Sequence, residues 1–276
     1  MKSYFNNKHI LGILIISLIV GLFSPTTKIN AQEQLRSTLK EVAEKIIEIS
    51  EIKREINLTA EERLQKETQA RKNALSKIFD LTLLEDKDLK NKLNGLKNLS
   101  EEQREVKDDL LSVFVENENA YKEMKKRLDE AGTLEEIKQL ATDFKNWRNA
   151  VYNSKAEKIV SFVLIFQQKK TLAIAKERLE KIKINLEELE NEKLISREET
   201  DNLLQIAETS LQKAEELNKQ AENSLQSNPI TSLLERLGLK QQESPKVLIA
   251  KSLGKIKIAY AAFLDLSNLV KDKIEK

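Results

Sequence analysis

The stretch Ile159-Val160-Ser161-Phe162-Val163-Leu164-Ile165-Phe166 decides the fold, because it is apolar on every side of a helix. Other elements must cover such a segment all round, so we expect it to form the centre of the core. Beyond Gln167 the same helix becomes amphipathic. Its apolar positions are Leu172, Ala175, Leu179, Ile182, Leu186 and Leu189. A matching stripe begins after Ser196, and the short turn between the two helices predicts an antiparallel coiled-coil hairpin over residues 167–226.

The other helix starts are indicated by capping boxes, in which Ser or Thr precedes Glu or Gln by three residues. The pairs are Thr59 with Glu62, Ser100 with Gln103, Thr133 with Glu136, Ser154 with Glu157, and Ser196 with Glu199. They predict helices over about residues 33–57, from 59 to about 84 with a short helix after it, over 100–131 and over 133–152. Ile56 and Leu64 belong to the apolar stripes of the first two. Another short helix should end at Gly238, and Ser244-Pro245 opens the last helix.

Turn residues are scarce in residues 32–276, which contain only four glycines and two prolines. Charged residues make up 33% and aromatic residues 5% of the chain, a composition that favours a narrow core and long helices. We therefore predict an all-α fold, an elongated antiparallel helical bundle with a projecting coiled-coil hairpin arm. Residues 32–166 form the N-terminal bundle in this prediction, and the helices of residues 227–276 pack back on that bundle.

The N-terminus has the pattern of a secretory leader. Residues 1–9 are basic without an acid, and residues 10–23 are continuously apolar but too short to span a bilayer. Pro25 follows, and Ala31 supplies the small residue before a cleavage site. We expect a signal peptide over residues 1–31, cleaved before Gln32, and an extracytoplasmic location in a periplasm, at a cell surface or in the medium. An uncleaved membrane anchor is the alternative.

The residues available for chemistry narrow the possible functions. The only histidine, His9, lies in the leader, and the chain has no cysteine. Nucleophilic triads, thiol chemistry and His or Cys metal sites are therefore not expected. Loss of the three leader lysines leaves a net charge of about −1, which does not favour nucleic-acid binding. We predict no catalytic residues, no cofactor and no metal. An enzyme would have to rely on Asp, Glu, Lys, Ser or Tyr, and no spacing singles out a pair.

Two groups of residues form a possible interaction patch. Phe144, Trp147, Arg148 and Tyr152 bring together aromatic side chains, although the favoured explanation is that Phe144, Trp147 and Val151 form one buried helix face. Lys251, Lys255 and Lys257 belong to a basic stretch of the last helix, which could contact anionic lipid or a cell-wall polymer or could be a solvated face. Membrane association is expected only through this helix or through an uncleaved leader.

One short element resembles a known family. Leu99-Ser100-Glu101-Glu102-Gln103 is similar to the L-T-x-x-Q element of the Spy/CpxP family of periplasmic helical chaperones, with Ser in place of Thr. Leu58-Thr59-Ala60-Glu61-Glu62 is a partial second copy that has Glu in place of Gln. The resemblance covers about ten residues and implies a chaperone that holds clients on an apolar face. The same residues also form helix N-caps.

These observations favour an exported, non-enzymatic helical scaffold or protein-binding module. Its partner would be another protein, or a second copy through the helical seams. The alternatives are a chaperone-like client-binding protein and a peripheral protein of the membrane or cell wall.

Overall fold

The computed structural model describes residues 29–225 and 243–274, and all regular structure in these two ranges is helical. The predicted all-α fold class is therefore confirmed for this part of the chain. The signal peptide predicted for residues 1–31 lies almost wholly outside the described residues, as does the short helix predicted to end at Gly238. Within the described ranges, no helix combines the length and the apolar character needed to cross a bilayer.

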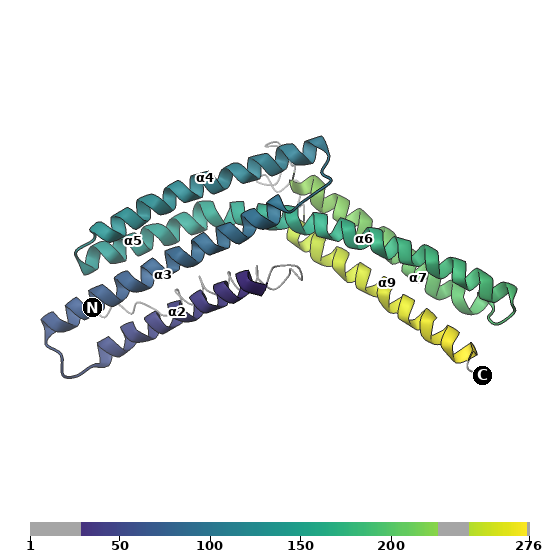
Figure 1. Ribbon diagram of the computed structural model, residues 1–276, viewed down its shortest axis with the longest axis horizontal. Coiled ribbons are helices and arrows are strands. Elements are labelled where there is room, and N and C mark those ends of the chain that lie inside the picture. Colours follow the sequence, from purple (N-terminus) through teal and green to yellow (C-terminus); the bar gives the residue numbers. More distant parts are fainter. Residues whose placement is uncertain (1–28, 226–242, 275–276) are drawn as a thin grey trace. The chain divides into compact units, whose positions relative to one another are not determined.

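The chain divides into two compact units, one ending at Val160 and the other beginning at Ser161. The first unit contains α2 (Ile29–Arg54), α3 (Ala60–Asn94), α4 (Glu101–Glu130), α5 (Leu134–Trp147), the π-helical turn η1 (Arg148–Tyr152) and the start of α6 (Asn153–Asn191) (Figure 1). The second unit contains the rest of α6, α7 (Arg197–Leu225) and α9 (Pro245–Ile274). The sequence predicts a boundary after residue 166, and the division falls shortly before it.

Most predicted helix starts are found in the structure. Thr59, Ser100 and Thr133 each form a complete capping box at the start of α3, α4 and α5. Ser196 precedes α7, and its backbone N–H donates to Glu199 Oε2 at 3.2 Å. The two segments that resemble the Spy/CpxP element are thus N-caps of ordinary long helices.

Two predicted helix breaks are wrong. Ser154 lies inside α6, because η1 continues the helix from α5 into α6 without a turn. α3 does not end near residue 84 but continues to Asn94, supported by a Lys92–Asp88 ion pair of 2.6 Å one turn apart. It ends at Gly95, whose N–H donates to the Asn91 carbonyl at 2.9 Å.

In the first unit, α2 and α3 form an antiparallel pair and α4 and α5 pack on α3. The Lys77–Glu41 ion pair of 2.7 Å and the Lys53–Glu67 pair of 3.6 Å fix the antiparallel order of α2 and α3. The main cluster of buried residues lies among α3, α4 and α5. Its members are Leu75, Phe79, Tyr121, Met124, Leu128, Ile137, Leu140 and Phe144. α2 contributes Val42 and Ile52 as its buried apolar residues.

In the second unit, a ladder of ion pairs connects α6 to α7. Lys169 pairs with Glu222 at 2.7 Å, Lys176 with Glu215 at 2.8 Å, and Lys183 with Glu208 at 2.5 Å. Each step moves seven residues forward along α6 and seven backward along α7, which is the heptad spacing of an antiparallel coiled coil. The predicted pairing of these two helices is thus present.

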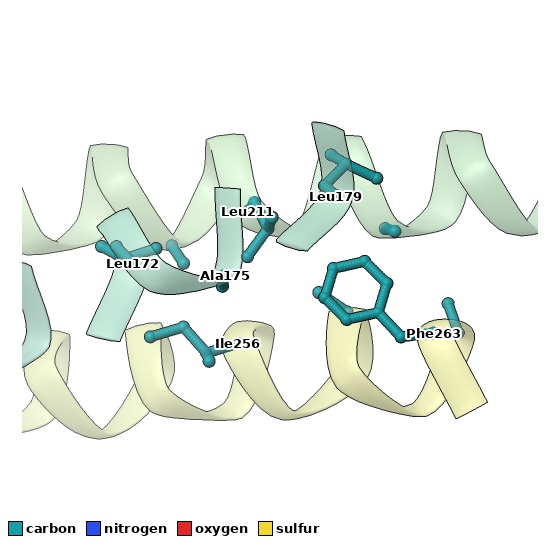
Figure 2. Packing of buried hydrophobic residues seen from close by; sticks show 10 residues of the cluster. Leu172, Ala175, Leu179, Leu211, Ile256 and Phe263 are labelled. Carbon is teal, nitrogen blue, oxygen red and sulfur yellow. The ribbon is translucent and has the colours of Figure 1, made fainter. Parts of the chain in front are cut away.

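α9 packs along this pair, so the second unit has three helices rather than a bare hairpin. Ile256 and Phe263 of α9 point toward Leu172 and Leu179 of α6 and Leu211 of α7 (Figure 2). The sequence predicts that this helix packs on the N-terminal bundle. In the structure, the buried residues of α9 contact α6 and α7. Further along, Leu266 of α9 joins Leu186 and Ile195 in a second cluster. The buried alanines of α7, at Ala207, Ala214 and Ala221, recur at heptad spacing and allow close packing.

Buried polar side chains fix how these three helices align. Gln168 Nε2 donates to the Ile249 carbonyl at 2.7 Å, and Asn218 Nδ2 donates to the Ile165 carbonyl at 3.3 Å. Ser252 Oγ donates to the carbonyl of Ala214 at 2.8 Å. A shift in register would bury these groups without partners, so they select one alignment.

The apolar stretch of residues 159–166 is largely buried, but it is not the centre of a single core. It spans the division between the two units, and Ile165 packs with Leu217, Leu248 and Ile249 of the second unit. The main clusters of both units lie elsewhere along the helices. The segment that is apolar on every side therefore lies where the first unit ends and the second begins.

Candidate functional site

The predicted interaction patch falls into two separate groups. Phe144, Trp147, Arg148 and Tyr152 belong to the first unit, whereas Lys251, Lys255 and Lys257 lie on α9 in the second. The first four side chains contact one another inside the unit, and Phe144, Arg148 and Tyr152 are buried. The lysines lie on or near the surface.

The aromatic side chains form a continuous cluster of mainly edge-on and tilted ring contacts. Phe144 contacts Phe79 with ring centroids 4.8 Å apart and Trp147 with centroids 5.9 Å apart. Trp147 also contacts Tyr121 and Tyr152, at 5.2 and 5.6 Å. Such contacts add to the burial energy of a core. Phe144 and Trp147 thus pack on the inside of the unit, as the buried helix face predicts, whereas Val151 of the same predicted face is 37% exposed.

The π-helical turn η1 directs the Arg148 side chain into the first unit. Arg148 Nη1 donates to Thr82 Oγ1 at 2.8 Å, and Nη2 donates to Glu85 Oε2 at 3.1 Å. The guanidinium also lies 4.8 Å from the centre of the Tyr152 ring. Single π-helical turns inside α-helices often lie at functional sites, so this cluster is the first candidate for a site.

A second polar pair lies one turn along α3. Asn117 Nδ2 of α4 donates to Asp86 Oδ2 at 3.0 Å, and both side chains are buried. Burial raises the pKa of Asp86 to about 6, although hydrogen bonds from Asn117 and Tyr152 and the charge of Arg148 oppose this effect. Burial also raises the pKa of Tyr121 and of Tyr152.

The sequence alone did not reveal this polar cluster. Thr82 and Asp86 stand where the apolar stripe of Leu75, Phe79, Leu89 and Leu93 passes along α3. A polar residue at a core-facing position of a long amphipathic helix is the signal that would have indicated it.

A shallow groove of about 380 Å³ lies beside the polar cluster, between α3 and α4. Its lining includes the apolar side chains of Leu83, Phe114 and Tyr121, together with Asp86. Four lysines also line it, at positions 87, 90, 122 and 125. A carboxyl with a pKa near 6 can exchange protons at neutral pH, as a general acid or base does. The hydrogen bonds to Asp86 come from residues of the core, an arrangement that also serves to fix α3 against α4.

Replacing Asp86 with asparagine should change how stability depends on pH. The pKa of Asp86 is higher in the folded than in the unfolded chain, so the folded state gains stability at low pH and loses it as the pH rises from about 4 to about 6. Compared with Asp86→Asn, the wild type should lose roughly 2 kcal/mol of folding free energy between about pH 4.5 and about pH 7.5. Urea unfolding followed by Trp147 fluorescence at both pH values measures this.

The matched control for that experiment is Asp80→Asn, because Asp80 lies on the same helix in an exposed pair with Lys125. This control should follow the pH dependence of the wild type. If Asp86→Asn also follows it, the buried carboxyl does not have a raised pKa.

No group of three or more His, Cys, Asp or Glu side chains in residues 33–225 and 243–273 is arranged to hold a metal ion. Many of the exposed ionised groups that the structure describes form ion pairs along or between helices, such as Lys181 with Glu177 at 2.8 Å. These pairs are typical of solvated helix faces.

Two apolar side chains in and near the turn between α2 and α3 are exposed, although the sequence predicts that they belong to packed apolar stripes. Ile56 in this turn is 91% exposed and Leu64 in α3 is 53% exposed, so both predictions of burial are wrong. Lys72 Nζ donates to the carbonyls of Asp129 and Ala131, which places the α4–α5 turn beside Lys72 of α3. Residues of α3 before that point extend past α4 and α5 (Figure 1). We call Ile56 and Leu64 the hairpin tip, because they lie at or near the turn of the antiparallel α2–α3 hairpin.

The chain matches no protein-family model, no curated protein and no solved structure.

Proposed function

We propose that the protein is an exported, non-enzymatic helical scaffold that binds another protein through the hairpin tip. The observation that carries this proposal is the exposure of Ile56, at 91%, in a turn whose backbone is held in place. Arg63 Nη2 donates to the Glu55 carbonyl at 2.8 Å, and the Thr59 capping box fixes the other end of the turn. A large apolar side chain on an ordered turn loses little entropy on binding.

The composition of the chain supports the same class of function. Its leader-like N-terminus is typical of export, and its helices carry many charged side chains on their outer faces, with ion pairs such as Lys122–Glu118. Among the exposed large apolar side chains of the described residues, Ile56 has the largest exposed fraction. A few exposed apolar anchors surrounded by polar residues are the usual composition of a protein-binding surface.

Photocrosslinking tests this proposal directly. Benzoylphenylalanine replaces Ile56 in the full chain, in cells that produce the protein, and the same replacement of Val115 is the control. Val115 is 59% exposed on α4, away from the tip in sequence. We expect a discrete crosslinked species from position 56 and none from position 115. Equal crosslinking at both positions, or none at either, contradicts binding through the tip.

The chaperone-like alternative predicts a different result in the same experiment. A client-binding surface would give crosslinks of many masses at position 56, and the purified protein would suppress aggregation of unrelated unfolded proteins. A binding module of defined specificity gives neither result.

A further inference from the structure

The inner face of α9, which is the side that packs on α6 and α7, is buried within the second unit. Leu248, Ile249, Ile256, Ala259, Ala262, Phe263 and Leu266 are buried against α6 and α7. Together with the buried Ser252, these positions fall on one face of the helix. In an ordinary amphipathic helix the opposite face is polar.

The outer face of α9 is apolar as well over its first five turns. Val247, Leu253, Ile258 and Leu264 are between 39 and 66% exposed. Ala250 and Ala261 lie between them and are exposed, and a side chain added at Gly254 would meet nothing within 4 Å. None of the described residues covers this surface, which we call the outer face of α9.

Between Glu243 and Asp265, the charge of the outer face has one sign. From Ser244 to Leu264 the sequence contains no Asp or Glu but has lysines at positions 246, 251, 255 and 257. Lys251 pairs with Glu243, whereas Lys246 and Lys257 form no ion pair with a described residue. At 100° per residue, Lys246 and Lys257 fall on the same stripe as Leu253 and Leu264. Cations therefore alternate with apolar side chains along this face.

This mixture favours a lipid surface over a protein partner. Lysine is depleted in protein–protein interfaces, and a second copy of α9 would bring lysine against lysine over these turns. An anionic membrane surface instead attracts each lysine, while the exposed Val, Leu and Ile side chains enter the boundary of the acyl chains. The long lysine stems lie along the apolar surface with the ammonium groups at the phosphates.

We propose that the outer face of α9 binds the surface of an anionic lipid bilayer. This inference goes beyond the proposed protein-binding function and does not depend on it, since the hairpin tip belongs to the first unit. It assigns the predicted residue Lys257, together with Lys246, to contact with lipid phosphates. Of the other two predicted residues, Lys251 pairs with Glu243, and Lys255 is half-buried toward the inner face.

Vesicle cosedimentation tests this inference with residues 32–276, which retain every buried side chain described above. Vesicles of phosphatidylcholine with phosphatidylglycerol should bind the protein, and vesicles of phosphatidylcholine alone should not. Binding should weaken as salt is added. The double variant Lys246→Glu/Lys257→Glu should lose about 30-fold in affinity. Failure to bind the anionic vesicles overturns the inference.

Two further variants distinguish insertion of this face into lipid from simple charge attraction. Lys40→Glu/Lys122→Glu makes the same charge change on exposed lysines of the first unit and should bind as the wild type does. Leu253→Gln/Leu264→Gln should lose binding although its charge is unchanged, and circular dichroism checks that it remains folded. Normal binding by the leucine variant, or equal loss by the control, would show that net charge alone attracts the protein and would overturn the inference. A lipid-free dimer that the leucine variant abolishes would assign the face to a second copy instead.

Discussion

Replacing Arg148 with methionine is expected to destabilise the first unit by about 3–5 kcal/mol, because it leaves one member of a buried ion pair alone. The Glu85 carboxylate would keep its buried position but lose the guanidinium 3.1 Å away, and its Oε1 already has no hydrogen-bond partner. Thr82 would lose its donor too. Urea unfolding followed by Trp147 fluorescence measures the change in unfolding free energy. Trp147 is the only tryptophan in the sequence, and it lies in the first unit.

Two other variants make this expectation specific. Lys40→Met removes an exposed partner of Glu44 and should change stability by less than about 0.5 kcal/mol. Arg148→Met/Glu85→Gln should recover part of the loss, since the charge that Glu85 would otherwise keep without its partner is then removed as well. If Arg148→Met costs no more than Lys40→Met, the polar cluster does not contribute to stability as described.

In the second unit, Leu211→Ala should destabilise the fold by about 2–5 kcal/mol through the loss of apolar burial and the cavity it leaves. Leu211 is buried between α6 and α9 at the middle of the cluster shown in Figure 2. Leu264→Ala on α9 is the matched control, because that side chain is 66% exposed. Urea unfolding followed by far-ultraviolet circular dichroism compares the two. Similar losses in both variants would mean that the outer face of α9 is covered within the unit.

The sequence predicts the local features of this fold well. The capping boxes at Thr59, Ser100 and Thr133 each satisfy backbone donors within one helical turn, so they are visible without tertiary information. The pairing of α6 with α7 follows from two apolar stripes and a short turn. Ser154 and Glu157 have the same spacing as these capping boxes, although no helix begins there. The tertiary contacts of Arg148 and Tyr152 keep the helix continuous at this point.

The features that depend on packing could not be predicted in this way. Whether Ile56 and Leu64 are covered depends on where α4 and α5 end in space, and that is set by contacts such as Lys72 with the α4–α5 turn. The buried cluster of Asp86, Asn117 and Arg148 joins residues from three segments of the chain. Asp86 stands on the apolar stripe of α3, but nothing in the sequence shows that Asn117 and Arg148 lie beside it. The outer face of α9 could be recognised only once its inner face had been assigned.

The mass of residues 32–276 in solution, measured by light scattering during size-exclusion chromatography, tests the central claim most directly. The hairpin tip and the outer face of α9 are proposed to bind other molecules and not a second copy of the chain. We therefore expect a monomer throughout the micromolar concentration range, with or without the Ile56→Ser/Leu64→Ser substitutions. A stable dimer that these substitutions convert to monomer would contradict this claim, because the tip would then be an interface for self-association.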